Sequence, residues 1–249
     1  MPLYFFTESY PYKSGVILTS LSGTDVTPIS RAADYDKANY WETDAATPEL
    51  KIDLGTPQAI DSLWIKSGNV TTFELYHSSD GSSWTLVSGS PVDKSNGIFW
   101  FFNFTEQTKR YWKIKVTAKT GNAKIYEFML MQLRLELDGD NAPANASPIF
   151  QDTDGGGYQM ADGSYTTFSG ENDFAKIDMP FEYTPKANRD NLYLLYSTPT
   201  KRPPLVILPD EESPESIFKM LWLSTEFPLI HGSSYKGAGF SGTLSFQEY

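Results

Sequence analysis

The residues best suited to chemistry stand together in one stretch, His77-Ser78-Ser79-Asp80. A histidine, a hydroxyl and a carboxylate are the groups of a nucleophilic triad. The stretch continues as Gly81-Ser82-Ser83-Trp84 and lies between two alternating runs, so it is typical of a β-hairpin turn. Neighbouring strand residues point to opposite faces, and no nucleophile-elbow pattern surrounds them. We therefore predict a structural or surface role for His77, and also for His231, the second of the two histidines.

Carboxylates are the other abundant reactive groups, with 31 Asp and Glu in 249 residues. A glycosidase needs two carboxylates a set distance apart, and no organised pair is visible in the sequence. A Walker loop, a dinucleotide-binding fingerprint and a His-Glu-X-X-His helix are all absent. The chain has no cysteine, which excludes disulfides, thiolate catalysis and Cys-based zinc sites. We therefore predict a protein that is not an enzyme.

One loop has the oxygen-rich composition of a cation site. Residues 33–39 offer the Asp34 and Asp36 carboxylates, the Asn39 amide oxygen and backbone carbonyls such as that of Ala33. Calcium prefers several such oxygens from one tight loop. The alternative is a loop without metal that is held by Asx turns. We predict no other cofactor.

Aromatic side chains on loops could stack on sugar rings. The candidates are Tyr35, Tyr40, Trp64 and Trp100. The alternative for each is burial in the core, which is the more common place for a large aromatic ring in a sandwich.

Alternating apolar residues predict the elements that would position these groups. Short strands are expected at residues 3–6, 15–19, 50–54, 60–65, 98–104, 109–116 and 124–130. The spacing is even, with no convincing helix between the runs and a turn at Gly55-Thr56-Pro57. This pattern indicates an all-β fold, an antiparallel sandwich or jelly roll.

The order of five motifs resembles the discoidin, or coagulation-factor type C, domain of the galactose-binding-like superfamily. The motifs are residues 33–41, Ile52-Asp53-Leu54-Gly55, the 78–84 turn, Arg110-Tyr111-Trp112-Lys113-Ile114 and Tyr126-Glu127-Phe128. The resemblance covers about residues 12–135 and implies an eight-stranded jelly roll that binds sugars, lipids or proteins through loops at one end.

The same resemblance implies a structural calcium in the 33–39 loop, with help from Glu127. The chain departs from the family pattern there. Tyr35 stands where glycine is usual, Lys37 adds a positive charge and Asn39 replaces the usual threonine. At these three positions the loop differs from the family's calcium loop.

The second half of the chain differs in composition from the first half. We expect a first domain at residues 1–137, a linker at 138–147 and a β-rich assembly domain at 148–249, with strands near 174–179, 218–222 and 240–249. Residues 187–190 are expected to form a turn, and the proline-flanked run 205–208 an edge strand. This half resembles small structural proteins of phage tails and baseplates.

The net charge and the hydropathy of the chain argue against nucleic acids and membranes as partners. The net charge is −11, so the chain has little with which to grip a phosphate backbone, and we predict no nucleic acid partner. The apolar run 98–102 is too short to span a bilayer, so we predict no membrane insertion. The N-terminal residues show no signal-peptide pattern.

Taken together, these features lead to one main hypothesis and two alternatives. The main hypothesis is a non-enzymatic structural component of a phage tail or baseplate, located in the virion. Multiple copies in a ring would contact other tail proteins, and the jelly roll could contact a cell-surface glycan. The first alternative is a carbohydrate-binding module of a surface or secreted protein. The second, an enzyme acting on glycosides, is disfavoured because no acid pair is organised in the sequence.

Overall fold

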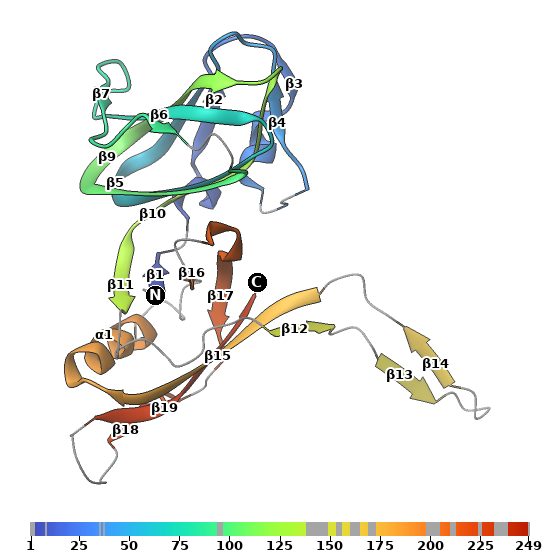
Figure 1. Ribbon diagram of the computed structural model, residues 1–249, viewed down its shortest axis with the longest axis vertical. Coiled ribbons are helices and arrows are strands. Elements are labelled where there is room, and N and C mark those ends of the chain that lie inside the picture. Colours follow the sequence, from blue (N-terminus) through green and yellow to red (C-terminus); the bar gives the residue numbers. More distant parts are fainter. Residues whose placement is uncertain are drawn as a thin grey trace. The chain divides into compact units, whose positions relative to one another are not determined.

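The computed structural model divides the chain into two compact units (Figure 1). Residues 9–133 form one, here called the sandwich unit, and residues 1–8 with 134–249 form the other, the C-terminal unit. The residues that the structure describes are 3–7, 9–34, 36, 38–93, 97–137, 149–152, 156–159, 165–168, 173–197, 205–209, 213–223, 226–231 and 239–248.

The sandwich unit is built from nine strands among its described residues. Their bounds are β2 (Ile17–Ser20), β3 (Asp25–Thr27), β4 (Trp41–Thr43), β5 (Glu49–Ser67), β6 (Val70–Ser78), β7 (Thr85–Leu86), β8 (Val92–Asp93), β9 (Phe99–Lys119) and β10 (Ala123–Met131). Short 3₁₀ helices cover Tyr10–Tyr12 and Ile29–Ala33. The main strand order is β3-β4-β10-β5-β9-β6-β7, with β2 beside β5 and β8 beside β6.

Two long strands fold this sheet over its own core. β5 and β9 pair antiparallel twice, at residues 49–53 with 111–115 and again at 58–66 with 99–109. The register shifts between the two stretches, which bends both strands at one place (Figure 1). The sequence predicted a chain reversal at 55–57 and two separate strands at 98–104 and 109–116. The structure corrects this, because both segments are single bent strands.

The core of the sandwich unit confirms the predicted alternation. Ile52 and Leu63, on opposite sides of the β5 bend, belong to the same buried cluster, together with Trp112 and Ile114 of β9. Residues on both sides of the bend therefore face one core. The unit is an all-β antiparallel sandwich, as predicted.

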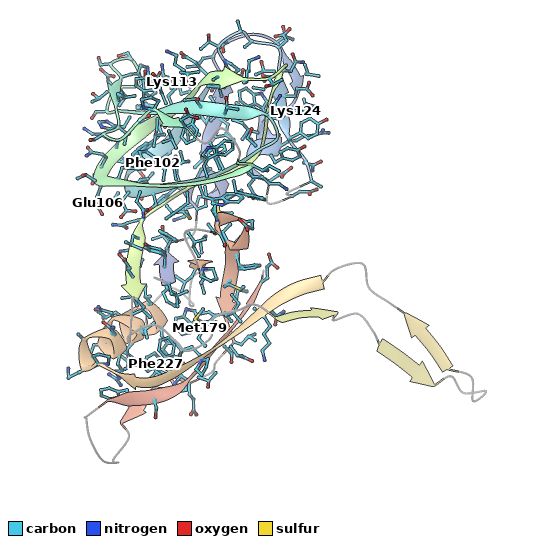
Figure 2. All side chains as sticks on the ribbon, viewed as in Figure 1. Phe102, Glu106, Lys113, Lys124, Met179 and Phe227 are labelled. Atoms are coloured by element: carbon cyan, nitrogen blue, oxygen red, sulfur yellow. The ribbon has the colours of Figure 1, made fainter. Side chains whose placement is uncertain are left out.

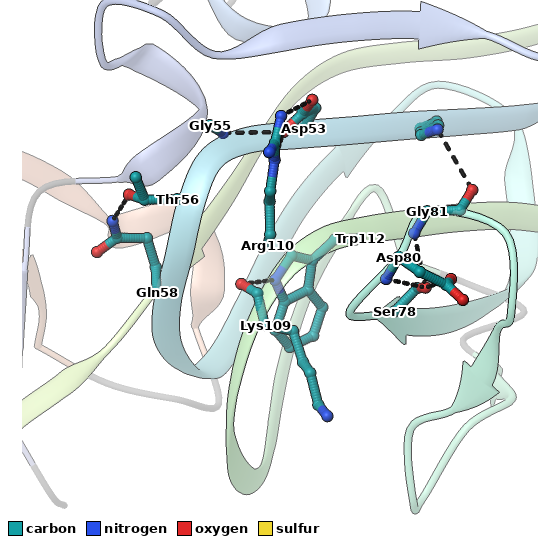
Figure 3. A network of polar contacts seen from close by, with 11 residues as sticks. Asp53, Gly55, Thr56, Gln58, Ser78, Asp80, Gly81, Lys109, Arg110 and Trp112 are labelled. Carbon is teal, nitrogen blue, oxygen red and sulfur yellow. Dashed lines mark hydrogen bonds and ion pairs between the residues drawn. The ribbon is translucent and has the colours of Figure 1, made fainter.

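A bidentate ion pair ties the bend together. Arg110 Nε lies 2.7 Å from Asp53 Oδ1, and Arg110 Nη2 donates to Asp53 Oδ2 at 2.9 Å (Figure 3). The backbone N–H of Gly55 also donates to Asp53 Oδ1, at 2.9 Å. The Arg110 hydrogen bond, more than any other contact, holds the pKa of Asp53 below its usual value. Two of the five sequence motifs therefore meet at this bend.

The C-terminal unit is also β-rich. Its strands are β1 (Leu3–Phe6), β11 (Leu133–Leu137), β12 (Ile149–Asp152), β13 (Gly156–Gln159), β14 (Tyr165–Phe168), β15 (Asp173–Thr184), β16 (Leu205–Leu208), β17 (Phe218–Trp222), β18 (Ile230–His231) and β19 (Phe240–Glu248). The larger sheet has the order β11-β1-β16-β17-β19-β15-β12, with β18 beside β19. β13 and β14 form a separate pair. Pro214–Ser216 is a short 3₁₀ helix.

Three predictions for the chain outside the sandwich are corrected by this sheet. Residues 187–190 lie in helix α1 (Lys186–Ser197), not in a turn. β16 is not an edge strand, because β1 and β17 flank it. β1 and β11, which the sequence placed in the first domain at 1–137, pair in the C-terminal sheet. The predicted strands at 174–179, 218–222 and 240–249 are confirmed as β15, β17 and β19.

The predicted linker at 138–147 lies outside the described residues. None of the described helices has the length and apolar character that crossing a membrane would require.

Candidate binding site

Of the three predicted sugar-stacking aromatics that the structure describes, two are buried and one is partly exposed. Trp100 is completely buried and meets the Phe73 ring edge-on at 6.2 Å between centroids. Trp64 is also completely buried and lies 6.0 Å from the Phe99 ring. Neither indole presents a face on which a sugar could stack. Tyr40 is partly exposed, and Tyr35 lies outside the described residues.

Tyr40 belongs to a group that the sequence did not bring together. Its ring lies 5.2 Å from the partly exposed ring of Tyr126, at an interplanar angle of 59°. The Lys124 ammonium lies 4.8 Å from the centre of the Tyr40 ring, and the Lys66 ammonium lies 5.0 Å from that of Tyr126. We call Tyr40, Lys66, Lys124 and Tyr126 the tyrosine–lysine cluster.

An irregularity in β10 sets the position of Tyr126. The register of β10 against β5 shifts between Ile125 and Glu127, so Tyr126 is an extra residue in its strand. Its ring then lies over Gly68, where a Cβ atom would approach Tyr126 Cε2 to 3.0 Å. A side chain at position 68 would therefore crowd the ring, and glycine leaves room for the ring to lie there.

The Asn69 side chain holds three chain segments together beside the cluster. Its amide nitrogen donates to the carbonyl oxygens of Thr120, at 2.5 Å, and Asn122. Its amide oxygen accepts from the backbone N–H of Lys124 at 2.9 Å. The β5–β6 turn, the β9–β10 turn and the start of β10 therefore form one frame. Gly-Asn between two alternating runs is a hairpin signal, and it could have revealed this turn from the sequence.

Polar groups border the two rings. Glu42 lies 3.6 Å from the Lys124 ammonium and accepts a hydrogen bond from the Asn122 amide at 3.0 Å. A carboxylate, an ammonium group and an amide thus stand beside partly exposed aromatic faces. Ligand sites typically combine apolar surface with a few placed polar groups of this kind.

The predicted calcium loop is held by its own hydrogen bonds. Asp34 accepts from the Asp36 backbone N–H at 3.0 Å, and Asp36 accepts from that of Ala38 at 2.9 Å. The Asn39 amide nitrogen bridges the two carboxylates, at 2.9 Å from Asp36 and 3.3 Å from Asp34. These are the contacts of the Asx-turn alternative.

The other predicted calcium ligands add little to this loop. Ala33 ends a 3₁₀ helix, and the buried Glu127 carboxylate accepts a hydrogen bond from the Tyr12 hydroxyl at 2.5 Å. The described residues contain no group of three or more His, Cys, Asp or Glu side chains that could hold a metal. Calcium takes six to eight oxygens, more than the two loop carboxylates supply, so the site stays a prediction.

The His77-to-Asp80 stretch is used to build a turn. β6 and β7 pair through Tyr76 with Leu86 and His77 with Thr85, which confirms the predicted hairpin. Asp80 accepts hydrogen bonds from the backbone N–H groups of Ser82 and Ser83, at 2.8 and 2.7 Å.

The surroundings of this stretch shift the pKa values of its two titratable groups, Asp80 and His77. The two backbone hydrogen bonds hold the pKa of Asp80 far below its usual value. His77 is nearly buried against the Trp112 ring, 5.9 Å away, and burial and then the Lys109 charge lower its pKa. Its imidazole is therefore a neutral packing group beside the core.

Residues 17–129 match the family model of the F5/8 type C domain. The predicted resemblance to a discoidin-type domain is therefore confirmed for this part of the chain. No curated protein sequence matches the chain. The family match lies within the sandwich unit, and nothing in it points to a phage tail or baseplate.

Several solved structures resemble about half of the chain. The family 32 carbohydrate-binding module of NanJ from C. perfringens, in complex with galactose, is 22% identical with a TM-score of 0.44, covering 50% of this chain and 98% of that one. Chitosan-binding module 1 from Paenibacillus sp. IK-5 is 17% identical with a TM-score of 0.44, covering 51% and 99%. SpGH29 is 14% identical with a TM-score of 0.44, covering 51% of this chain but only 28% of its own.

Proposed function

We propose that the sandwich unit is a non-catalytic carbohydrate-binding module and that the sugar binds at the tyrosine–lysine cluster. The observation that carries the proposal is the pair of partly exposed rings, Tyr40 and Tyr126, set side by side with hydrogen-bonding groups around them. The F5/8 type C match over residues 17–129 supports a binding module more than an enzyme.

The cluster has the two kinds of surface that a sugar needs. The C–H face of a pyranose ring is apolar and packs on an aromatic ring, whereas its hydroxyls need donors and acceptors. Glu42 can accept from a hydroxyl, and the Lys124 ammonium can donate to one. The Asn69 frame fixes the segments that carry these groups, so little order has to be gained on binding.

The first prediction concerns the two rings. In a glycan array followed by isothermal titration with the best ligand, the Tyr40→Ala, Tyr126→Ala double variant should bind at least about tenfold more weakly than the wild type, a loss of about 1.4 kcal/mol. The reason is that the double variant loses both stacking faces. Tyr193→Ala is the matched control, because that tyrosine is 43% exposed in the C-terminal unit.

Two results would count against this proposal in different ways. Unchanged affinity in the double variant would show that the glycan binds elsewhere on the protein. An array on which the wild type binds no glycan would contradict the carbohydrate-binding function itself.

The second prediction concerns calcium. If the 34–39 loop binds calcium, the wild-type melting temperature should fall when EDTA replaces calcium, because a ligand that binds only the folded state stabilises it. Asp34→Asn with Asp36→Asn should remove that response, since the loop would lose both carboxylates. Equal melting curves of the wild type in calcium and in EDTA would leave the Asx-turn loop as the complete description.

Two broader expectations accompany the proposed function. A carbohydrate-binding module would act in a secreted or cell-surface protein, where it meets glycans. The tail or baseplate role, with a ring of copies and tail-protein partners, stays a prediction. Electron microscopy of purified particles would support it by showing the protein in the assembly.

A further inference from the structure

A second surface with aromatic and basic side chains covers the outer face of three neighbouring strands. Residues that face away from the core alternate with core residues on β5, β9 and β6, and the register aligns them in rows. Across the three strands the rows are Glu49, Lys115 and Glu74; Lys51, Lys113 and Tyr76; and Asp53, Tyr111 and Ser78. We call these nine residues the outer face.

All three acids on the outer face are already paired. Glu49 lies 3.2 Å from the Lys113 ammonium, and Glu74 lies 3.5 Å from that of Lys115. The third acid, Asp53, forms the bidentate pair with Arg110. Each of these three acids therefore has a cationic partner already, and none is left on this face to neutralise a further lysine.

Two lysines beside the Ser78–Trp84 turn have no carboxylate of a described residue within ion-pair distance. The Lys51 ammonium donates to the Gly81 carbonyl at 3.4 Å, and that of Lys109 donates to the Ser79 hydroxyl at 3.2 Å. The Asp80 carboxylate between them is committed to Ser82, Ser83 and Ser78. Figure 3 shows Lys109 and the turn on neighbouring strands.

The positive charges of Lys51 and Lys109 shift the pKa values of nearby side chains. Lys51 contributes to the lowered pKa of Asp53, and Lys109 to the lowered pKa of His77. Neither ammonium forms an ion pair with a described residue, so each can offer its charge to an anion although the whole chain carries −11.

Partly exposed rings stand next to Lys51 and next to Lys113, a lysine of the outer face. The Lys51 ammonium lies 5.0 Å from the centre of the Tyr111 ring, and the Lys113 ammonium lies 5.1 Å from that of Trp84. Flexible lysine side chains can leave the rings when a ligand supplies an anion, which would expose apolar surface beside two cations. That combination fits a polymer that alternates sugar rings with acid groups.

We propose that Lys51 and Lys109, with the Tyr111 and Trp84 rings beside them, bind an acidic polysaccharide through its carboxylate or sulfate groups. Widely spaced acid groups suit two lysines on an acidic protein, whereas the dense phosphates of a nucleic acid would be repelled by the net charge. The site is separate from the tyrosine–lysine cluster. Figure 2 shows Lys113 of the outer face and Lys124 of the cluster at different places on the sandwich unit.

The test is binding of the full chain to hyaluronate, which carries one carboxylate per disaccharide, and to keratan sulfate, which carries about one sulfate per disaccharide, with neutral dextran as reference. The wild type should bind at least one of the two polyanions, and the binding should weaken as salt is raised from 50 to 300 mM, because salt screens exposed charges. Lys51→Gln with Lys109→Gln should weaken it about tenfold or more. Lys186→Gln, an 80% exposed lysine of the C-terminal unit, is the control for a change in charge alone.

Several outcomes would overturn this proposal. They are failure of the wild type to bind either polyanion at low salt, equal binding by the double variant, and binding of single-stranded DNA as tight as that of the polysaccharide. Unchanged melting temperatures of the variants would confirm that they fold. The Tyr40→Ala, Tyr126→Ala variant should keep polyanion binding, so failure here and failure of the proposed function can be told apart.

Discussion

Replacing Trp112 with alanine should lower the free energy of unfolding of the sandwich unit by about 3–5 kcal/mol. The indole is completely buried at the centre of β9, between the His77 ring at 5.9 Å and the Phe104 ring at 5.7 Å. Its Nε1 donates to the Lys109 carbonyl at 3.3 Å. Alanine would leave a large cavity and a carbonyl without its partner, and neither loss can be repaired by small shifts.

Trp84→Ala is the matched control, because Trp84 belongs to another of the five sequence motifs but lies partly exposed at the end of the hairpin turn. Its ring contact with Lys113 is worth about 1–2 kcal/mol at most. The variants would be unfolded with denaturant and the unfolding monitored by hydrogen exchange. Peptides from residues 9–133 would then give the free energy of unfolding of the sandwich unit alone. Equal losses in the two variants would contradict the assigned roles.

The contrast between these tryptophans shows what strand alternation could predict. On β9, Trp112, Ile114 and Val116 share one parity, and all three are buried in the predicted core. Trp64 shows the limit of the same argument. It lies on the face opposite Leu63 and Ile65 and was a candidate for stacking on sugars, yet it is completely buried. Parity gives the face on which a residue lies but not what covers that face.

The candidate site was harder to predict because it depends on contacts between distant segments. Tyr40 was chosen from the sequence, but its partner Tyr126 is placed by a β-bulge, which no short-range pattern revealed. Lys66 and Lys124 belong to the cluster because β10 pairs with β5 and with β4, and the Asn69 side chain adds a link between turns that are about 50 residues apart. The order of the sequence motifs was therefore enough to predict the type of domain. Predicting the site would have required the register in which the strands pair.

In the C-terminal unit, local sequence patterns likewise did not predict the order of the strands in the sheet. Prolines around 205–208 suggested an edge strand, but the four residues of β16 contain no proline and can pair on both sides. One of its partners is β1, some 200 residues earlier in the chain. Residues 187–196 form a helix although their short apolar run gave no clear helical period, because packing of Leu192 into the core outweighs weak local preference.

The second large effect is expected at Gly23, where the chain turns between β2 and β3. The residue has φ +73°, and an added Cβ atom would lie 2.6 Å from Ala45 Cβ and 2.7 Å from its backbone. Ala45 is itself buried, in the connection between β4 and β5, so neither segment can easily move aside. Gly23→Ala should therefore cost about 1–2 kcal/mol for the left-handed backbone and about 1–3 kcal/mol more for the clash.

Gly121→Ala separates these two contributions. Gly121 has nearly the same φ, +71°, but an added Cβ atom there would meet nothing within 4 Å. It should therefore show the backbone cost alone, measured by the same hydrogen exchange of the sandwich unit. If Gly23→Ala were no more destabilising than Gly121→Ala, the two connections would not be packed as tightly as the distances require. The larger loss at Gly23 would show that the short strands β2 and β3 are fixed by contact of their connecting loop with the β4–β5 connection, and not only by their few ladder hydrogen bonds.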